Sequence, residues 1–500
     1  MIEVERKYSA GADFVLPPLG RTGWVVASVQ TVDLEATYYD TADLRLAAAH
    51  ITLRRRVGGK DAGWHLKLPA GRDRDEIQRP PGRVGTVPTG LADLVLARTR
   101  GQVLVPVARI DTTRSLTTIT ADDGTALVEV ADDQVEGRRL DHGHGTPTSW
   151  REIEVELLTS GHDKSRAKVG RALCRAGATP SPSKSKLARV LGPVGDGAPP
   201  RPDDTARPED TAAFAIADYL AQQVQALLHA DPYVRQGRPD AVHAMRVASR
   251  RLRTALRTFA PLLDVDALGD LSATLAWLAG ALGEVRDRDV LGERMVAQLD
   301  ALPGHLGGEA VRARLLDDEL ATGGRRAHTA LVRSLRSARY LALLDRLDAL
   351  VTTPPLTSAA DQPAATVLAP LAATAWRRLC RHAEAALTSG EDDDLHACRK
   401  AAKQMRYAAE ALTPSLGRPA RRLARQATSV QTLLGEHQDA VVARTLLRRL
   451  ADDERHAFAY GVLWAGEQHR AQACAAQFVD LWASVEPAGR RALTQLRRAR

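Results

Sequence analysis

Hydrophobic and polar residues alternate through much of the first 191 positions of the chain. Residues 151–158 show the pattern most clearly, with glutamates set between aliphatic residues (Glu152, Glu154 and Glu156 beside Ile153, Val155 and Leu157). Successive side chains of a β-strand point to opposite faces, so this alternation predicts strands that are apolar on one face and ionic on the other. The same pattern predicts strands at 2–8, 37–40, 51–57, 64–68, 109–120 and 126–133.

The pattern changes after residue 210, where apolar residues recur at the helical spacing of three and four. Residues 192–210, between the two patterns, are rich in Pro, Gly, Asp and Arg and predict a linker. We therefore expect an antiparallel β-domain at 1–191 and an all-α domain at 211–500, which together make an α+β protein. Pro354, Pro355 and Pro363 predict a further break inside the helical part.

Length and composition fit this division. A chain of 500 residues is too long for one ordinary domain. The net charge of +8 is mild, so any preference for anions must come from the placement of charges. The four cysteines form no CxxC pair, which predicts neither a disulfide framework nor a zinc site (Cys174, Cys380, Cys398 and Cys474). The chain opens with charged residues and has no uncharged run of about 18, so we expect a cytoplasmic protein without a membrane span.

Candidate chemistry begins in the first predicted strand, where Glu3, Glu5 and Lys7 share one face. Hard cations such as Mg²⁺ bind carboxylate oxygens and share their ligand shell with substrate phosphates. A solvated edge strand is the alternative, and the heptapeptide alone favours it. The choice depends on whether the other strands carry matching ionic faces.

Basic residues lie on the ionic faces of the middle strands, at Arg54, Arg56, Lys67 and Arg114. If the ionic faces point inward, the strands form a barrel with a charged lumen, in which carboxylates hold metal and arginines bind phosphate oxygens in pairs. A half-exposed sheet is the alternative. Such a sheet usually mixes both signs along each strand, whereas Glu-x-Glu and Arg-x-Arg occur here on separate strands.

This ordered set of residues resembles the CYTH family, also called triphosphate tunnel metalloenzymes. The matching residues are Glu3-x-Glu5-x-Lys7, Tyr39-Asp40-Thr41, Leu53-Arg54-x-Arg56, Leu66-Lys67, Arg114, Asp133, Glu154-x-Glu156 and Ser185-Lys186-x-x-Arg189. The resemblance implies an antiparallel eight-stranded β-tunnel with flanking helices. It also implies a divalent cation and the hydrolysis of inorganic triphosphate, thiamine triphosphate or RNA 5′-triphosphates, or adenylate cyclase activity.

The resemblance also implies roles for single residues. The metal ligands for Mg or Mn would be Glu3, Glu5, Asp133, Glu154 and Glu156. The catalytic residues that bind phosphate would be Lys7, Arg54, Arg56, Lys67, Arg114 and Lys186. Two alternatives stay open, since Asp133 could orient an arginine and Lys186 could be a surface lysine. Glu129 and Glu152 are secondary candidates that could simply balance arginines.

A basic stripe repeats in the helical part. Its first copy follows helical spacing on one face and consists of His243, Arg246, Arg250, Arg253 and Arg257. The second copy lies 153 residues further on and consists of His396, Arg399, Lys403 and Arg406. Like charges one turn apart destabilise a helix, so a bound polyanion or acidic neighbours must compensate them. A Leu-Gly-Glu-x-x-Asp segment repeats as well, at 282–287 and 434–439, which predicts a duplication of about 211–352 and 364–500 into a pseudo-symmetric pair of helical bundles.

These two stripes and segments resemble the CHAD family, which is named for conserved histidines in an α-helical domain. The resemblance covers about residues 211–500 and implies binding of inorganic polyphosphate. Gln404 and Glu410 stand where the first copy has Arg251 and Arg257, so the second copy carries less positive charge.

We therefore expect a cytoplasmic phosphohydrolase that acts on inorganic triphosphate or polyphosphate ends, with a helical domain that binds polyphosphate. The alternative is a non-catalytic polyphosphate-binding protein associated with polyphosphate granules. Thiamine triphosphatase and adenylate cyclase activity rest on family analogy alone. Aromatics are sparse at 4%, which disfavours nucleic-acid binding by base stacking. The sequence specifies no protein partner.

Overall fold

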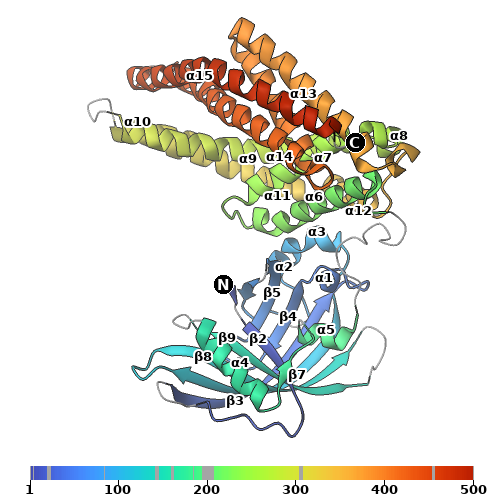
Figure 1. Cartoon of the computed structure of the whole chain (residues 1–500). Coiled ribbons are helices and arrows are strands. Elements are labelled where there is room, and N and C mark those ends of the chain that lie inside the picture. Colours follow the sequence, from blue (N-terminus) through green and yellow to red (C-terminus); the bar gives the residue numbers. More distant parts are fainter. Residues whose placement is uncertain are drawn as a thin grey trace. The chain divides into compact units, whose positions relative to one another are not determined.

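The computed structural model describes residues 2–498 except 4, 20–23, 72, 84, 141–145, 159–162, 184, 194–207, 303–307 and 453–455. The chain divides into two compact units, Met1–Ala198 and Pro199–Arg500, and each unit is described by itself (Figure 1). Most of the predicted linker, 192–210, lies outside the described residues. Within the described parts, none of the helices combines the length and the apolar character needed to cross a bilayer.

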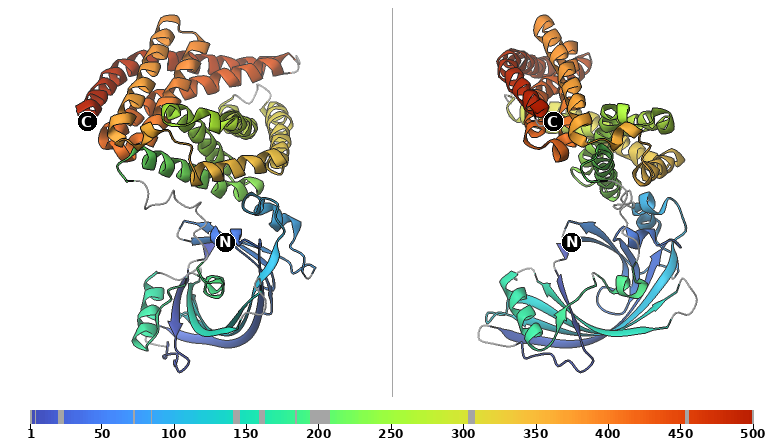
Figure 2. Two further views of the ribbon diagram at one scale, coloured as in Figure 1. Left: turned by 90° about the vertical axis from the view of Figure 1, so that its right-hand side faces the viewer. Right: turned by 45° about the vertical axis from the view of Figure 1, so that its right-hand side comes forward.

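The first unit is built on one antiparallel sheet, in the order β1-β6-β5-β4-β3-β7-β8-β9-β2-β10. Its strands are β1 Ile2–Glu3, β2 Glu5–Ala10, β3 Val25–Asp40, β4 Thr52–Val57, β5 Gly63–Ala70, β6 Asp73–Arg79, β7 Val105–Thr120, β8 Ala126–Arg139, β9 Thr148–Leu157 and β10 Thr179–Pro180. Figure 2 shows the long strands of the sheet curving round into an arc.

The expected antiparallel β-domain followed by a helical unit is confirmed, but the expectation of eight strands in a closed tunnel is wrong. The described sheet is open, with β1 and β10 at its two ends. It has ten described strands, or nine if β1 and β2 are counted as one N-terminal segment. That segment reaches both sides of the curved sheet, since Glu3 pairs with Arg74 of β6 and Glu5 pairs with Glu156 of β9. The β1–β6 pairing spans only two residues on each strand.

The sheet is apolar on its outer face where α4 packs on it, and most of its buried charges lie on its inner face. Helix α4, Asp163–Arg175, packs its Val169 and Leu173 against outer-face residues of the sheet such as Ile153 and Val155. Helix α5, Lys186–Leu191, packs on the inner face, where its Leu187 and Leu191 join a second apolar cluster with Ala36, Ile110 and Trp150. The charged side chains of the inner face that α5 leaves uncovered line the cavity. The short helices α1 Arg45–Ala48, α2 Thr89–Leu94 and α3 Leu96–Thr99 complete the unit.

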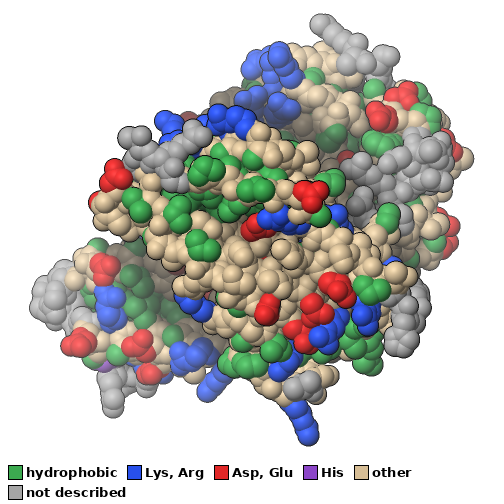
Figure 3. Space-filling model, turned by 90° about the horizontal axis from the view of Figure 1, so that it is seen from below, with side chains coloured by type: hydrophobic (Ala, Val, Ile, Leu, Met, Phe, Trp, Pro, Cys, Tyr) green, Lys and Arg blue, Asp and Glu red, His purple; other side chains and the backbone are tan. Residues whose placement is uncertain are grey.

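The outer surface carries charge differently. On the face shown in Figure 3, acidic and basic side chains stand in small groups among apolar and uncharged ones. Exposed pairs of this kind include Arg109 with Glu35 and Arg109 with Asp111. Such exposed pairs contribute little to stability, so the charges that organise this unit are those inside the sheet.

The second unit is almost wholly helical. Its long helices are α6 Ala212–Arg235, α7 Ala241–Thr258, α9 Leu271–Asp300, α11 Thr322–Leu335, α12 Ala338–Thr352, α13 Ala364–Ser389, α14 Asp392–Ala451 and α15 Ala457–Arg498. Shorter pieces are α8 Val265–Leu268 and α10 Gly308–Arg312, and a π-helical stretch at Ala313–Ala321 precedes α11. Helix α14 is two helices joined at Gly417, whose φ of 61° breaks the helical backbone between Pro414 and Pro419. The two basic stripes lie on α7 and on the first part of α14.

Asp40 fixes the turn that leads from β3 into α1. Its side chain is 1% exposed and accepts backbone N–H bonds from Thr41 at 2.7 Å, Leu46 at 2.8 Å and Ala47 at 2.8 Å. An alanine there would leave these donors without the carboxylate that satisfies them in the interior.

We expect Asp40→Ala to lower the free energy of unfolding of the first unit by about 2–4 kcal/mol, because several buried donors lose their acceptor together. Chemical denaturation of the full chain measures the change. Asp122→Asn is the control, because Asp122 is exposed on the β7–β8 hairpin. Equal stability of both variants would show that the Asp40 bonds do not hold this turn.

Candidate functional site

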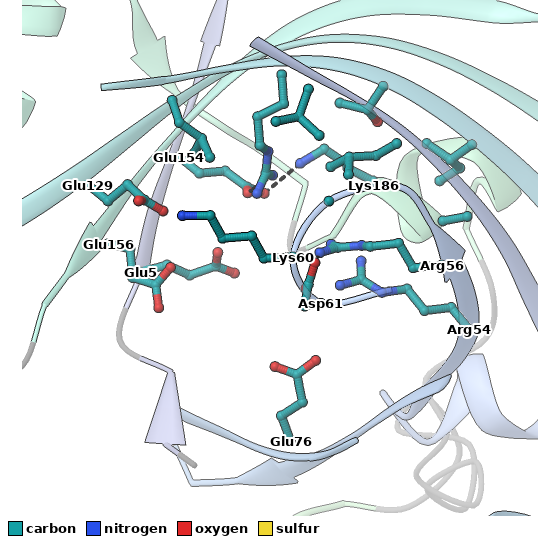
Figure 4. Close-up of a pocket in the computed structure, with 18 of the residues that line it drawn as sticks. Glu5, Arg54, Arg56, Lys60, Asp61, Glu76, Glu129, Glu154, Glu156 and Lys186 are labelled. Carbon is teal, nitrogen blue, oxygen red and sulfur yellow. Dashed lines mark hydrogen bonds and ion pairs between the residues drawn. The ribbon is translucent and has the colours of Figure 1, made fainter. Parts of the chain in front are cut away.

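The inner face of the sheet lines a cavity of about 430 Å³ (Figure 4). Most of the residues predicted for a site lie on its wall: Glu5, Lys7, Arg54, Arg56, Lys67, Arg114, Glu154, Glu156 and Lys186. They come from β2, β4, β5, β7, β9 and α5. The side chain of Glu3 lies outside the described residues, and Asp133 is buried behind the wall. Alternation along the strands thus brings together residues up to about 180 positions apart in the sequence.

Glu154 is the centre of the ionic network. It accepts hydrogen bonds from Lys186 at 2.6 Å and Arg114 at 2.6 Å, and it also contacts Lys7. Burial alone would raise the pKa of Glu154, but the three cations outweigh it and hold that pKa well below its ordinary value. Burial would lower the pKa of the Lys186 ammonium group, but the carboxylates of Glu154, Asp133 and Glu152 outweigh it and raise that pKa. Both groups are therefore ionised at neutral pH.

Asp133 orients Arg114. The carboxylate is 0% exposed and accepts two parallel bonds from the guanidinium, each of 2.7 Å. Lys186 contacts the same carboxylate at 2.9 Å and Glu152 at 3.0 Å. This geometry matches the orienting alternative for Asp133, and Lys186 is buried instead of being a surface lysine. Glu152 is also buried beside Lys186 and does not line the cavity.

Strand β4 forms a basic wall on the side of the cavity that faces Glu5, Glu129 and Glu156 (Figure 4). Arg54 and Arg56 point into the cavity, as Figure 4 shows. Arg54 donates a hydrogen bond of 3.2 Å to the Tyr38 hydroxyl, and Arg56 forms an ion pair with Asp61. Burial would raise the pKa of Tyr38, but Arg54 outweighs burial and lowers it.

Glu76 on β6 faces the same cavity. One of its carboxylate oxygens is hydrogen-bonded to His65 Nδ1 at 2.7 Å, and the other lies 3.8 Å from the Lys67 ammonium nitrogen. Burial opposes ionisation of Glu76, yet His65, Lys67 and Arg54 lower its pKa to about 2. Sequence reasoning missed Glu76, because β6 mixes charges of both signs without an apolar alternation.

A row of carboxylates crosses three neighbouring strands. Glu5 of β2 pairs in register with Glu156 of β9, which pairs in register with Glu129 of β8. Figure 4 shows these side chains on the side of the cavity opposite Arg54 and Arg56. Carboxylate oxygens are the donors that Mg²⁺ and Mn²⁺ prefer. Among the described residues, however, no three potential metal-binding side chains already form a closed cluster. The donor chemistry fits a divalent cation, while its ligand set stays a prediction.

The helical unit has a cavity of about 420 Å³ between α7, α9 and α14. The first positions of both basic stripes meet there: His243, Arg246 and Arg250 from α7, and His396, Arg399 and Lys403 from α14. Arg286 of α9 adds further positive charge, which Asp287 and Asp439 partly compensate. Arg294 also lines the cavity but is bonded to Glu467 and Glu436. Both repeated Leu-Gly-Glu-x-x-Asp segments thus supply acids to this cavity.

The later positions of the stripes do not line this cavity. Arg406 donates to Glu410 at 2.7 Å, and Arg251 donates to the same carboxylate at 2.7 Å. Arg257 is exposed near the end of α7, and burial together with Arg257 lowers the pKa of Arg253. Of the nine predicted polyphosphate-binding residues, Arg253, Arg257 and Arg406 therefore stand apart from the other six.

Positive charge in the helical cavity is under-compensated. Burial and the neighbouring guanidinium groups of Arg399, Arg250 and Arg246 lower the pKa of Lys403 to about 7. Burial and nearby cations also lower the pKa of His243 and of His396. Each added proton therefore meets repulsion, which is the expected condition of a cavity that binds an anion.

Comparison with known proteins agrees with this architecture. A CYTH domain model matches residues 1–191 and a CHAD domain model matches residues 218–448. Uncharacterized protein Rv2226 of Mycobacterium tuberculosis (strain ATCC 25618 / H37Rv) is 38% identical over 520 residues, which cover 98% of both chains. Among solved structures, PptA from Streptomyces chartreusis is 29% identical, with a TM-score of 0.48 over 55% of this chain and 99% of its own. The CHAD domain from the plant Ricinus communis is 25% identical, with a TM-score of 0.43 over 59% of this chain and 96% of its own.

The chain therefore belongs to the family of proteins that join an N-terminal CYTH domain, of the triphosphate tunnel metalloenzyme type, to a C-terminal CHAD domain.

Lys403→Met should stabilise the unliganded protein near neutral pH. The pKa of Lys403 is lower in the folded than in the unfolded chain, so the folded state loses stability as pH falls from about 10 towards 7. Removing the amine removes this loss. We expect the unfolding midpoint of the second unit to rise by about 2–4 °C at pH 6.5, the shift that about 1 kcal/mol produces.

Differential scanning calorimetry of the full chain in a phosphate-free buffer measures this effect, and the gain should shrink at pH 9.5. Lys400→Met is the matched control, since Lys400 is exposed on the same helix. A midpoint that falls in Lys403→Met, or that rises equally in both variants, would contradict the account.

Proposed function

We propose that the first unit is a triphosphatase that hydrolyses inorganic triphosphate or the ends of inorganic polyphosphate with Mg²⁺ or Mn²⁺. The observation that supports this proposal is the division of one cavity into a basic wall and a carboxylate wall. The basic wall matches the charge of a phosphate chain, and the carboxylate wall matches the charge of a cation bound to that chain.

The chain's own residues would act mainly by positioning. Arg54, Arg56 and Arg114 would bind phosphate oxygens, because guanidinium groups match the geometry of such oxygens. Asp133 would keep Arg114 in the orientation that the structure gives it. Lys186, which is held charged by its carboxylate neighbours, would stabilise charge that develops on the phosphate.

Glu5, Glu129 and Glu156 would hold the divalent cation, with Glu3 and Glu154 as further ligands. When bound, such a cation neutralises phosphate charge and lowers the pKa of bound water. Glu154 is already bonded to Lys186 and Arg114, so it serves this role only if those bonds rearrange.

The helical unit, in the same proposal, binds inorganic polyphosphate at the cavity between α7, α9 and α14. A chain with one charge per phosphate suits a cavity in which guanidinium groups from two helices converge and acids are too few to balance them. Tethering to the first unit would raise the local concentration of substrate. Location at polyphosphate granules would follow from this binding.

A non-catalytic polyphosphate-binding protein is the second candidate. The observation that favours it is the saturation of Glu154 by Lys7, Lys186 and Arg114, which leaves that carboxylate committed to ion pairs. A catalytic role for the cavity requires these pairs to exchange for phosphate and cation.

Hydrolysis of tripolyphosphate by the full chain tests the first candidate. We expect phosphate release in Mg²⁺ or Mn²⁺, and a loss of about 100-fold or more in kcat in Lys186→Met and in Glu156→Gln, because each removes charge that the reaction needs. Glu136→Gln is the control, since Glu136 is exposed on β8. No release from any triphosphate in either metal would favour the binding protein.

Polyphosphate binding by the full chain should strengthen as pH falls. Lys403, whose pKa lies at about 7, gains its charge between pH 8 and pH 6, so affinity should rise by up to about tenfold over that range. Calorimetric titration at pH 6, 7 and 8 measures this rise, which should shrink in Lys403→Met. Arg377→Ala, an exposed change on α13, is the control.

The same titration separates polyphosphate from nucleic acid. Binding should weaken with salt for any polyanion. Double-stranded DNA that displaces polyphosphate at equal phosphate concentration would contradict the assignment of the cavity to polyphosphate.

A further inference from the structure

The turn between β4 and β5 places a carboxylate on the basic wall of the cavity inside the sheet. Gly59, Lys60 and Asp61 of this turn line the cavity, and Asp61 forms an ion pair with Arg56. Figure 4 shows the Asp61 carboxylate directed at Arg56, beside Arg54. Asp61 is an acid on the wall to which a phosphate chain would bind, opposite the carboxylate row described above.

Arg56 needs an anionic partner. Burial lowers the pKa of Arg56, and Arg54 and Arg114 lower it further, while Asp61 acts in the opposite direction. A carboxylate and a phosphate group offer a guanidinium the same kind of acceptor, namely oxygens that share negative charge. In the unliganded protein Asp61 therefore supplies the charge that a bound phosphate would supply.

The pair is built so that Asp61 can leave it. The Asp61 side chain is 39% exposed, whereas that of Arg56 is 11% exposed, so the carboxylate can turn to water while the guanidinium stays in the wall. The backbone of the turn is fixed at both ends. His65 bonds to the Asp61 carbonyl at 2.8 Å, and a Cβ added at Gly58 would come within 2.2 Å of the Asp33 carbonyl oxygen. Movement of the side chain alone is therefore sufficient to free Arg56.

We propose that Asp61 competes with phosphate for Arg56. A triphosphate displaces it, because the chain also reaches Arg54, Arg114 and Lys186. Displacing Asp61 costs the same free energy for either ligand, and orthophosphate has fewer other contacts with which to offset that cost. Asp61 thus leaves a single phosphate weakly bound and favours release of the product. This inference rests on the proposed function of the cavity as a site for phosphate chains.

Asp61→Asn tests the inference, since it keeps the shape of the side chain and removes its charge. The full chain should carry Arg399→Ala and Lys403→Met in every sample, so that the helical cavity contributes little to binding. Titration calorimetry without divalent cation would use tripolyphosphate and orthophosphate as ligands. We expect Asp61→Asn to bind both ligands more tightly, by about three- to tenfold each, because neither ligand then has to displace the carboxylate.

Asp111→Asn is the matched control, because it removes the same charge from the outer face of the sheet, where Asp111 pairs with Arg109. Unchanged or weaker binding of both ligands to Asp61→Asn would overturn the inference and show that Asp61 merely holds Arg56 in place. Asp61→Ala repeats the test if the asparagine variant does not fold, as judged by circular dichroism.

Arg56→Gln separates failure of the inference from failure of the proposed function. If Arg56→Gln weakens tripolyphosphate binding but Asp61→Asn does not strengthen it, only the competition is wrong. If neither substitution changes binding, or if no sample binds either ligand, the cavity is not a phosphate site and both proposals fall. In active protein, a lower KM with stronger inhibition by orthophosphate provides a second readout of the same competition.

Discussion

Charge compensation inside the curved sheet is the constraint on which the first unit depends. The sheet turns its ionic face inward, so carboxylates, ammonium groups and guanidinium groups share one enclosed space. Removing these charges from water is costly unless each is paired or reaches solvent. Glu154 shows how the cost is met, because Lys186 and Arg114 bond to it directly and Asp133 in turn anchors Arg114. Breaking one member of such a network leaves its partners buried without compensation.

The helical unit meets the same constraint in the opposite way. Its cavity gathers cations from two equivalent helices, and its acids balance them only in part. The excess is relieved by depressed proton affinity, most clearly at Lys403, whose pKa falls to about 7. A balanced cavity holds its charges in place before a ligand arrives, whereas an under-compensated one is stabilised by the anion that it binds. In the proposed function, the two units would therefore suit different tasks on one kind of polyanion, namely positioning a short segment and retaining a long chain.

Much of this arrangement could be predicted from the sequence, because the two-residue alternation of the strands and the three-four spacing of the helices are both strong. Alternation placed Glu5 and Arg54 on the inner face of the sheet, and the three-four spacing placed His243 and Arg246 on one face of α7. Lys186, which lies on a helix, was expected from the family resemblance alone. Other features depend on tertiary structure that no local pattern encodes. Asp61 lies in a turn, where no repeating spacing of apolar residues indicates the direction in which a side chain points. Which arginines line the helical cavity depends on which of them are already paired with an acid. Arg406, for example, is paired with Glu410 and does not line the cavity.

The strand that supplies Glu76 was the hardest feature to predict, and the reason is physical. β6 carries charges of both signs in place of an apolar stripe, so alternation does not identify it. Yet β6 supplies Glu76, which compensates the basic wall from the far side through Lys67 and His65. The charge balance of the cavity therefore requires a strand that the hydrophobic pattern does not reveal. A count of the charges on the predicted strands, which leaves an excess of basic residues over acids on β4 and β5, would have pointed to a missing acidic neighbour.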